Sequence, residues 1–189
     1  MTFLFEDEAP SADEAPHNIY FALQPDDGAA QALCALDARR QEAGPPMESR
    51  RLHISLYSLG FHRRFPRREV VAAVQAASCV RHSPFMLELD RMATWGRGRG
   101  PLPVVAWSDE GISGVHRLHE VLCGVLAGTA DWRRRRPALE PHLTLWRAHR
   151  GMSETFIPPV RWWVREFVLL DSRYGEGRHE ILDRFPLVG

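Results

Sequence analysis

Residues 53–58 read HISLYS and residues 142–147 read HLTLWR, so one pattern occurs twice, 142 − 53 = 89 residues apart. In each stretch a hydroxyl follows the histidine by two residues, and the positions between are aliphatic. Side chains of a β-strand alternate between its two faces. The pattern therefore predicts two strands that bury their aliphatic side chains and present a histidine beside a hydroxyl, with Tyr57 and Trp146 on the histidine face.

The same order of elements precedes both motifs. A run of β-formers at 17–23 leads through helical spacing at 28–43 to the first motif. A strand at 103–107 leads through an amphipathic helix at 112–127 to the second motif. The repeated order predicts two similar lobes, each with one motif strand.

The remaining elements follow from the same signals. We predict a helix at 66–79 that starts with a proline, strands at 85–89, 164–170 and 180–182, and a loop at 95–100. Together with the repeat, these elements indicate an α+β fold.

Composition limits the possible classes. The 189 residues are 44 % apolar and 25 % charged, which suits one globular domain. We expect residues 1–16 to form a flexible acidic arm and residues 17–189 a single bilobal domain. All 24 basic residues are arginines, so this chain offers no Walker A lysine, Schiff base or nucleotidyl-lysine.

The charge and cysteine patterns are also informative. Because 24 acidic residues balance the 24 arginines, RNA or phosphate contacts must come from local clusters. Three widely spaced cysteines argue against a disulfide framework, and we expect buried thiols. The acidic start of the chain and the lack of a long apolar run predict a cytoplasmic protein without membrane contact.

Two histidine–hydroxyl pairs that face one cleft suit phosphate-ester chemistry. A neutral imidazole can deprotonate a nucleophile while an imidazolium protonates the leaving oxygen, and hydroxyls can bind the non-bridging oxygens. An ordinary histidine pKa near 6.5 makes both forms accessible around neutral pH. This scheme requires no metal and no other cofactor.

Longer stretches make a family resemblance specific. YFAL at 20–23, HISLYSLG at 53–60, PHLTLWR at 141–147 and IPPVRWWVREFVLLDS at 157–172 resemble the two-histidine (2H) phosphoesterases. Within them, the chain is most similar to the bacterial RNA 2′,3′-cyclic phosphodiesterases, also called 2′-5′ RNA ligases. The resemblance extends from Asn18 to Leu187.

The resemblance implies a fold and an activity. The fold would be a bilobal, pseudo-symmetric arrangement of antiparallel sheet with outer helices around a central cleft. The activity would be hydrolysis of a 2′,3′-cyclic phosphate, at an RNA end or in a small nucleotide, to a 2′-phosphate. Reversible 2′-5′ ligation without ATP is a further implied activity. His53 and His142 would be catalytic, and Ser55 and Thr144 would bind phosphate. We expect His142 to activate water and His53 to act as the acid, but the sequence leaves the opposite assignment open.

Three positions need comment. Ser55 replaces a commoner threonine and loses its stiffening methyl group. Arg147 matches a phosphate-binding candidate of the family, but it reaches the site only if its strand ends or bulges. Tyr20 lies off the aliphatic face of its strand and is a candidate for stacking a base.

Other candidates carry weaker signals. His116 and His119 are three apart on a helix, a spacing that suits a metal, but a core role for His119 is the stronger interpretation. The arginines of 96–100 and 133–136 are candidate RNA contacts or solvated loops. Four further histidines stand in loops or at element ends, and carry no signal: His62, His82, His149 and His179.

Two rival functions remain open from the sequence. One is a non-catalytic nucleotide-binding or RNA-binding module with the same fold, and the other is a metallohydrolase that uses Glu140. The leading hypothesis predicts an RNA terminus or a small cyclic nucleotide as the partner, and no obligate protein partner is evident.

Overall fold

The computed structural model describes residues 16–36, 48–96, 101–129, 137–173 and 178–189. Its elements, in chain order, are β1 (His17–Leu23), α1 (Asp27–Ala35), the 3-10 helix η2 (Ser49–Arg51), β2 (Ile54–His62), α2 (Arg67–Ala77), β3 (Phe85–Thr94), β4 (Leu102–Trp107), α3 (Ser113–Ala127), β5 (Leu143–Ala148), β6 (Thr155–Val164), β7 (Glu166–Arg173) and β8 (Arg178–Pro186). The predicted α+β class is confirmed.

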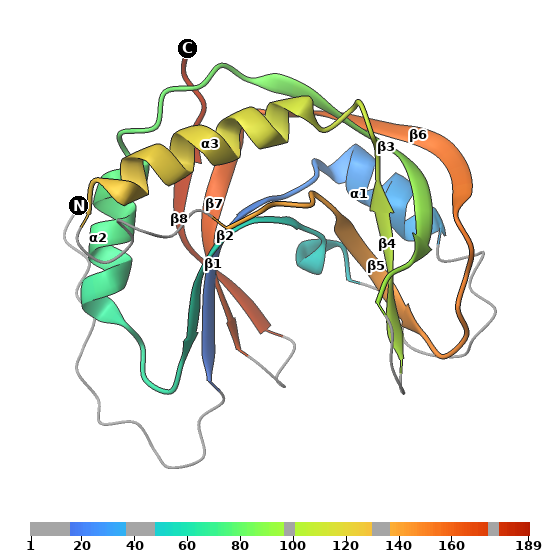
Figure 1. Cartoon of the computed structure of the whole chain (residues 1–189), viewed down its shortest axis with the longest axis horizontal. Helices are drawn as coiled ribbons and strands as arrows, with labels where there is room; N and C mark the ends of the chain where they lie inside the picture. The colour runs from blue at the N-terminus through green and yellow to red at the C-terminus, as the bar shows by residue number, and fades with distance from the viewer. Residues whose placement is uncertain (1–15, 37–47, 97–100, 130–136, 174–177) are drawn as a thin grey trace.

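The strands form one antiparallel sheet in the order β6-β3-β4-β5-β2-β1-β7-β8. Its middle junction, between β5 and β2, consists of a single pair, Ile54 with Leu143. We call β2-β1-β7-β8 the His53 half and β5-β4-β3-β6 the His142 half. Figure 1 shows the halves diverging like the two sides of an arch, with α3 along its outside. The two predicted lobes are thus halves of one continuous sheet.

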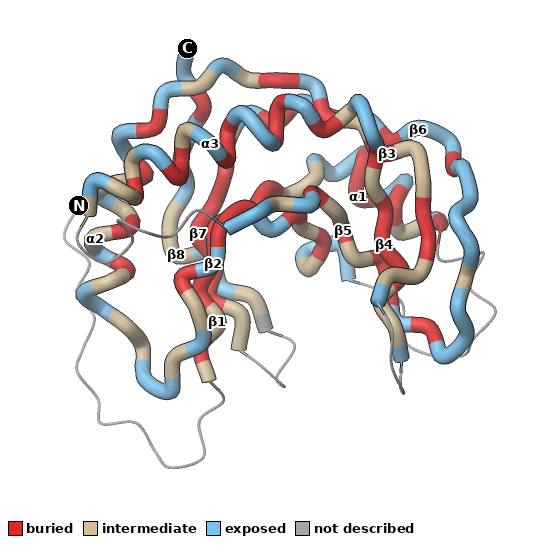
Figure 2. Tube along the Cα trace, viewed as in Figure 1, coloured by how far each residue is buried: buried red, intermediate tan, exposed pale blue. Residues whose placement is uncertain are grey.

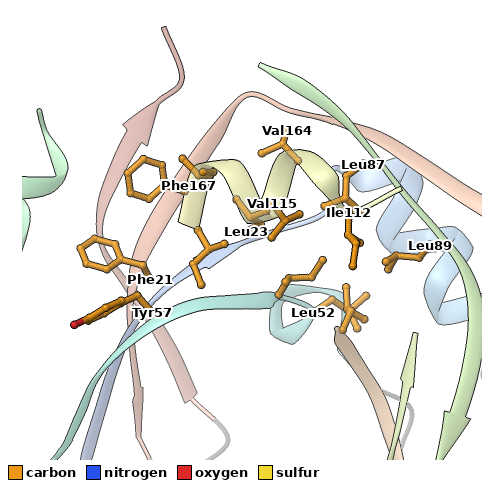
Figure 3. Packing of buried hydrophobic residues seen from close by; sticks show 14 of the residues in the cluster. Phe21, Leu23, Leu52, Tyr57, Leu87, Leu89, Ile112, Val115, Val164 and Phe167 are labelled. Carbon is orange, nitrogen blue, oxygen red and sulfur yellow. The ribbon is translucent and has the colours of Figure 1, made fainter. Parts of the chain in front are cut away.

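The core lies on the face of the sheet that the helices cover. Leu23 and Phe167 of the His53 half belong to the same buried cluster as Leu87 of the other half and Val115 of α3 (Figure 3). Burying one such side chain stabilises the fold by about 1.5–3 kcal/mol. The buried face of α3 is visible in Figure 2 as red segments recurring along the helix. The core therefore joins the two halves although their strands share only one pair.

The opposite face of the sheet, which carries Ser55 and Thr144, is called the site face below. Alternation along β1 places Tyr20 and Ala22 there, since Phe21 and Leu23 enter the main core. Val168 of β7 lies beside them in a small second cluster.

Both motif strands contain a β-bulge at the same offset from the histidine. In β2, Ser55 and Tyr57 pair with consecutive residues of β1, which leaves Leu56 as the extra residue. In β5, Thr144 and Trp146 pair with consecutive residues of β4, and Leu145 is extra. The bulge reverses the alternation, so the next aromatic residue turns into the core, with Tyr57 2 % and Trp146 7 % exposed. The prediction that these aromatics share the histidine face is wrong.

Other element predictions need correction. A strand was predicted at 164–170, but β6 ends at Val164 and a separate strand, β7, begins at Glu166. β6 itself was missed because it contains two consecutive prolines, 158 and 159, which interior strands avoid. Proline is tolerated here because β6 lies at the edge of the sheet. β8 is also longer than the predicted strand at 180–182.

Helix ends and cysteines add smaller points. α1 begins where the Asp26 carboxylate accepts a 2.8 Å hydrogen bond from the backbone N–H of Ala29. The three cysteines form no disulfide with one another; Cys123 is buried, but Cys79 is exposed and Cys34 partly exposed, so the prediction of three buried thiols is wrong. Three predicted features fall outside the described residues: most of the acidic arm, the helix beyond residue 36, and the arginines of 97–100 and 133–136.

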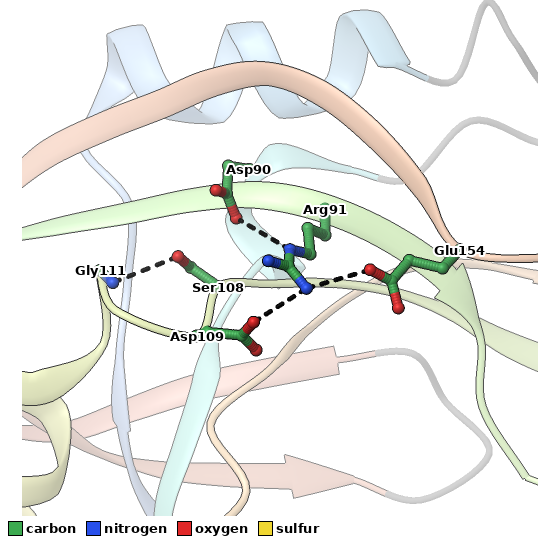
Figure 4. Close-up of polar contacts among 6 residues, drawn as sticks. All are labelled: Asp90, Arg91, Ser108, Asp109, Gly111 and Glu154. Atoms are coloured by element: carbon green, nitrogen blue, oxygen red, sulfur yellow. Dashed lines mark hydrogen bonds and ion pairs between the residues drawn. The ribbon is translucent and has the colours of Figure 1, made fainter.

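An ion-pair network centred on Arg91 joins β3 to the segment after β4 and to the segment before β6 (Figure 4). The Arg91 guanidinium of β3 lies 2.8 Å from the carboxylate of Asp109, which follows β4, and 3.0 Å from that of Glu154, which precedes β6. The hydroxyl of Ser108 accepts a 3.2 Å hydrogen bond from the Gly111 N–H in the turn that leads into α3. These contacts fix the end of β4.

Within the described ranges, no helix combines the length and the apolar character needed to cross a membrane.

Candidate active site

The single pair between the two halves brings the motif residues together. Ile54 and Leu143 are both fully buried on the helix-covered side. In an antiparallel ladder, the residue before one partner lies directly opposite the residue after the other, on the other face of the sheet and about 4.5–5.5 Å away. His53, Ser55, His142 and Thr144 therefore surround this pair on the site face. The histidine of each motif is placed beside the hydroxyl of the other.

Both imidazoles are oriented by the same backbone contact. Nδ1 of His53 lies 2.8 Å from the carbonyl oxygen of Arg51, and Nδ1 of His142 lies 2.8 Å from that of Glu140. A carbonyl oxygen only accepts, so each Nδ1 carries a proton and donates it. In the neutral form each Nε2 is then the free acceptor, and in the charged form it becomes a donor. Either histidine can thus serve as a base or an acid through Nε2.

The bulge in β5 returns Arg147 to the site face. Strict alternation would direct Arg147 away from Thr144, but the extra residue Leu145 reverses the order. Arg147 is exposed, and its guanidinium donates a 3.3 Å hydrogen bond to the carbonyl oxygen of Pro101. A cation therefore lies on the same face as the motif hydroxyls, as the phosphate-binding expectation requires. The equivalent position in the His53 half is Ser58, which carries no charge.

Two rings crowd His53. The ring centroid of Tyr20 lies 5.1 Å from that of His53, and the centroid of His179 lies 5.4 Å away in an edge-on arrangement. Burial lowers the pKa of His53, although its bond to the Arg51 carbonyl acts in the opposite direction. The unliganded site therefore favours a neutral His53.

Tyr20 and His179 are themselves strongly influenced by burial. Tyr20 is only 5 % exposed, which leaves little ring surface for a base, and burial raises the pKa of its hydroxyl to about 12. Burial also lowers the pKa of His179 to about 4, with the neighbouring His53 acting in the same direction. The Nδ1 atom of His179 is buried and finds no hydrogen-bond partner among the described residues.

Sequence reasoning missed His179 as a neighbour of the site. β8 pairs His179 with Ser172 of β7, whose side chain hydrogen-bonds Tyr20, so three adjacent strands converge on His53. The predicted strand at 180–182 begins just after His179. A longer strand prediction would have placed this histidine in the sheet, but it would not have shown which face of the sheet the side chain occupies.

His142 has different neighbours. The ring centroid of Trp95, which directly follows β3, lies 4.9 Å from that of His142. Trp107, the last residue of β4, lies 5.3 Å from Trp95, again measured between centroids. Both indoles are partly exposed. Sequence reasoning assigned Trp95 to a loop, and gave neither tryptophan a role.

Other candidate features lie near the site or apart from it. A cavity of about 530 Å³ adjoins Ser55 and is lined by residues 55–58 and 137–139.

His119 of α3 is 9 % exposed, and its Nε2 lies 3.3 Å from the sulfur of Cys123, as the core interpretation predicts. Among the described residues, no three histidine, cysteine or acidic side chains are grouped so that they could hold a metal ion. Glu140 contributes its backbone carbonyl to His142, while its side chain is exposed.

Comparisons with known proteins agree with this fold. A crystal structure described as a phosphoesterase matches with a TM-score of 0.72 and 25 % identity, over 92 % of this chain and 99 % of that one. E. coli LigT complexed with 3′-AMP matches with a TM-score of 0.70 and 26 % identity, over the same shares of the two chains. A Thermus thermophilus protein shares the fold at 20 % identity, with a TM-score of 0.71 over 91 % of this chain and 98 % of that one. No curated protein matches.

The family model for the 2′-5′ RNA ligase superfamily matches residues 25–176, which include both motifs. The resemblance read from the motifs is thereby confirmed. The chain belongs to the 2′-5′ RNA ligase superfamily, the two-histidine phosphoesterases.

Proposed function

We propose that this enzyme hydrolyses 2′,3′-cyclic phosphates, at RNA ends or in small nucleotides, to 2′-phosphates. Membership of the superfamily supports phosphoesterase or 2′-5′ ligase activity in general. The observation that carries the specific proposal is the matched pair of imidazoles, each held by a 2.8 Å bond from Nδ1 to a backbone carbonyl. Such a pair can move one proton off a nucleophile and another onto a leaving group.

The proposed reaction is a direct displacement at phosphorus. Nε2 of neutral His142 takes a proton from water as the water oxygen bonds to phosphorus. The bond from phosphorus to O3′ breaks, and Nε2–H of charged His53 donates its proton to O3′. The product is a 2′-phosphate with a free 3′-hydroxyl, and the two histidines end with exchanged protonation states.

Polar groups around the junction of β5 and β2 are proposed to hold the phosphate. The hydroxyls of Ser55 and Thr144 and the guanidinium of Arg147 are donors on the site face, and they suit the non-bridging oxygens. Because burial lowers the pKa of His53, the unliganded acid is neutral. An anionic diester beside it favours the charged form, so we expect His53 to gain its proton as substrate binds.

The proposed substrate class has support from relatives. Crystal structures of E. coli LigT contain 3′-AMP, phosphate, ATP or NADP+, at 25–28 % identity to this chain. Ligands with a nucleoside and a phosphate therefore bind a protein with this fold. With an RNA 5′-hydroxyl in place of water as the nucleophile, the same two proton transfers would release O3′ and leave a 2′-5′ linkage, which is ligation without ATP.

One assay tests the proposal directly. Purified protein is incubated with adenosine 2′,3′-cyclic phosphate in excess EDTA, and 2′-AMP is separated from 3′-AMP. We expect 2′-AMP to form at the rate seen without EDTA, because the proposed groups need no metal. Turnover that stops with EDTA and returns with a divalent ion would favour the metallohydrolase. Binding of 2′-AMP without any turnover would identify a nucleotide-binding module.

A further inference from the structure

Both motif imidazoles lie beside aromatic rings, but these rings differ in how much of their surface is exposed. Tyr20 beside His53 is 5 % exposed and is covered on the site face, whereas Trp95 beside His142 is partly exposed. Trp107 extends the Trp95 surface and is also partly exposed. Free aromatic surface next to a catalytic histidine is therefore found in the His142 half.

The two indoles lie on the side of the sheet where the reaction takes place. Along β4, Val104 and Ala106 enter the main core, so Pro103 and Trp107 point to the site face. Trp95 is fastened to this strand by a 2.9 Å hydrogen bond from its backbone N–H to the carbonyl oxygen of Pro103. Arg147 pairs with Pro103 from the other side. A cation and an indole thus flank Pro103 on adjacent strands.

The backbone that carries Trp107 is held in place. Trp107 pairs with Arg91 of β3, whose guanidinium binds the carboxylate of Asp109, two residues beyond Trp107 (Figure 4). Ser108, between them, is 3 % exposed and accepts the hydrogen bond from Gly111. A ring on such a support loses little conformational entropy when a ligand stacks on it.

We propose that Trp95 and Trp107 form the surface on which the nucleobase of the cleaved nucleotide stacks. This inference rests on the proposed function and adds the side on which the nucleoside lies. Stacking on an indole suits a nucleobase because every base offers a flat π-face, and it discriminates weakly among bases. The ligand class is therefore a nucleoside cyclic phosphate of any base, with the base on the His142 side.

The test uses two substrates and a matched control variant. Adenosine 2′,3′-cyclic phosphate carries a base, whereas glycerol 1,2-cyclic phosphate carries the reacting ring alone. Trp107→Ala is the main variant because Trp107 lies against Trp95, whereas the ring of Trp95 lies against His142 itself. Trp163→Ala is the control, since Trp163 is 49 % exposed and lies on the edge strand β6. Thermal unfolding confirms that each variant is folded, and Trp107→Phe serves if the alanine variant is not.

We expect Trp107→Ala to lower kcat/KM for the adenosine substrate by about 10- to 100-fold, mainly through KM, which is the usual contribution of one stacked base. The glycerol substrate should change less than about twofold, and Trp163→Ala should change neither. Equal losses on both substrates, or no loss on either, would overturn the stacking surface while leaving the cyclic phosphodiesterase intact.

A separate outcome concerns the proposed function itself. If the wild-type protein hydrolyses neither substrate, the cyclic phosphodiesterase proposal fails, and binding of 2′-AMP then tests the stacking surface by quenching of tryptophan fluorescence. Quenching that persists in Trp163→Ala and weakens in Trp107→Ala supports the surface. Quenching that is absent, or unchanged in Trp107→Ala, rejects it.

Discussion

The two halves of the sheet repeat their histidine motifs closely and the surroundings of the motifs poorly. At equivalent positions next to the motif strands, the His53 half has Tyr20 opposite Leu170, and the His142 half has Pro103 opposite Trp95. Tyr20 and Leu170 are 5 % and 0 % exposed, whereas Pro103 and Trp95 are both partly exposed. One half is closed around its histidine, and the other is open.

This difference separates two requirements of the site. Proton transfer needs two imidazoles in equivalent orientations, and both halves supply one through the same backbone contact. A nucleoside substrate is not symmetric, so it needs a binding surface on one side only. In the proposed mechanism, the duplicated motif would serve the chemistry, while the unequal neighbours would orient the substrate.

The largest expected effect comes from removing either histidine. His53→Ala and His142→Ala should each lower kcat by roughly 10²–10⁴-fold, the usual contribution of one positioned acid or base. The double variant should lose less than the product of the two single losses, because both residues act in one proton-transfer sequence. Steady-state kinetics measure all three, with His82→Ala as a control outside the motifs. A folded single variant with wild-type turnover would show that the two halves are not catalytically equivalent.

The motif hydroxyls should have smaller effects. A hydrogen bond to a charged phosphate contributes about 1.5–3 kcal/mol, so Ser55→Ala and Thr144→Ala should each lower kcat/KM by roughly 10- to 150-fold. Thr144 is half-buried and Ser55 exposed, so we expect the larger loss at Thr144. Thr144→Ser should be nearly neutral, and Ser78→Ala, just after the end of α2, controls for loss of a hydroxyl. A loss from Thr144→Ser as large as from Thr144→Ala would assign the role to the methyl group instead.

The pH profile should reflect the closed environment of His53. With one imidazole neutral and one charged, kcat/KM should be bell-shaped, and its limbs report macroscopic pKa values of the pair. Because burial lowers the pKa of His53, the doubly charged pair loses its first proton at a lower pH than usual. The acid limb should therefore lie below the ordinary histidine value of 6.5. A profile that is flat from about pH 5 to 9 would contradict acid–base catalysis by the pair.

The smallest expected effect concerns stability. Between its ordinary pKa of 6.5 and its folded pKa of about 4, His179 binds more protons in the unfolded chain than in the folded one. Folding stability should therefore fall as the pH decreases through this window. His179→Phe removes that contribution, so urea midpoints at about pH 7 and 5 should differ less for the variant than for the wild type. His82→Phe is the control, and identical pH dependence in variant and wild type would contradict the burial of His179.

The order of the elements, apart from β6, and the four motif residues could be predicted from the sequence, because aliphatic alternation around a histidine is a local signal. The roles of Tyr57 and Trp146 could not, since a β-bulge depends on pairing with a distant strand. The same bulge decides where Arg147 points. Local patterns show that a strand exists, but its neighbours determine where the alternation reverses.

The neighbours of the histidines were hidden for a related reason. His179 and Trp95 come from β8 and from the end of β3, far from the motifs in sequence. Each is recognisable only once the strand order is known, because β7, β8 and β3 carry no motif of their own. The lack of a sequence signal for these residues therefore does not mean that they are remote from the site.

The strand order also has a consequence for the way the chain is made. The strands of the His142 half follow one another from β3 to β6, apart from α3, whereas the His53 half joins β1 and β2 to β7 and β8. Ile19 pairs with Asp171, which is 171 − 19 = 152 residues later. During synthesis, which proceeds from the N-terminus, the first histidine motif emerges early but must wait for the last two strands. The part of the sheet around His53 is thus the last to be completed.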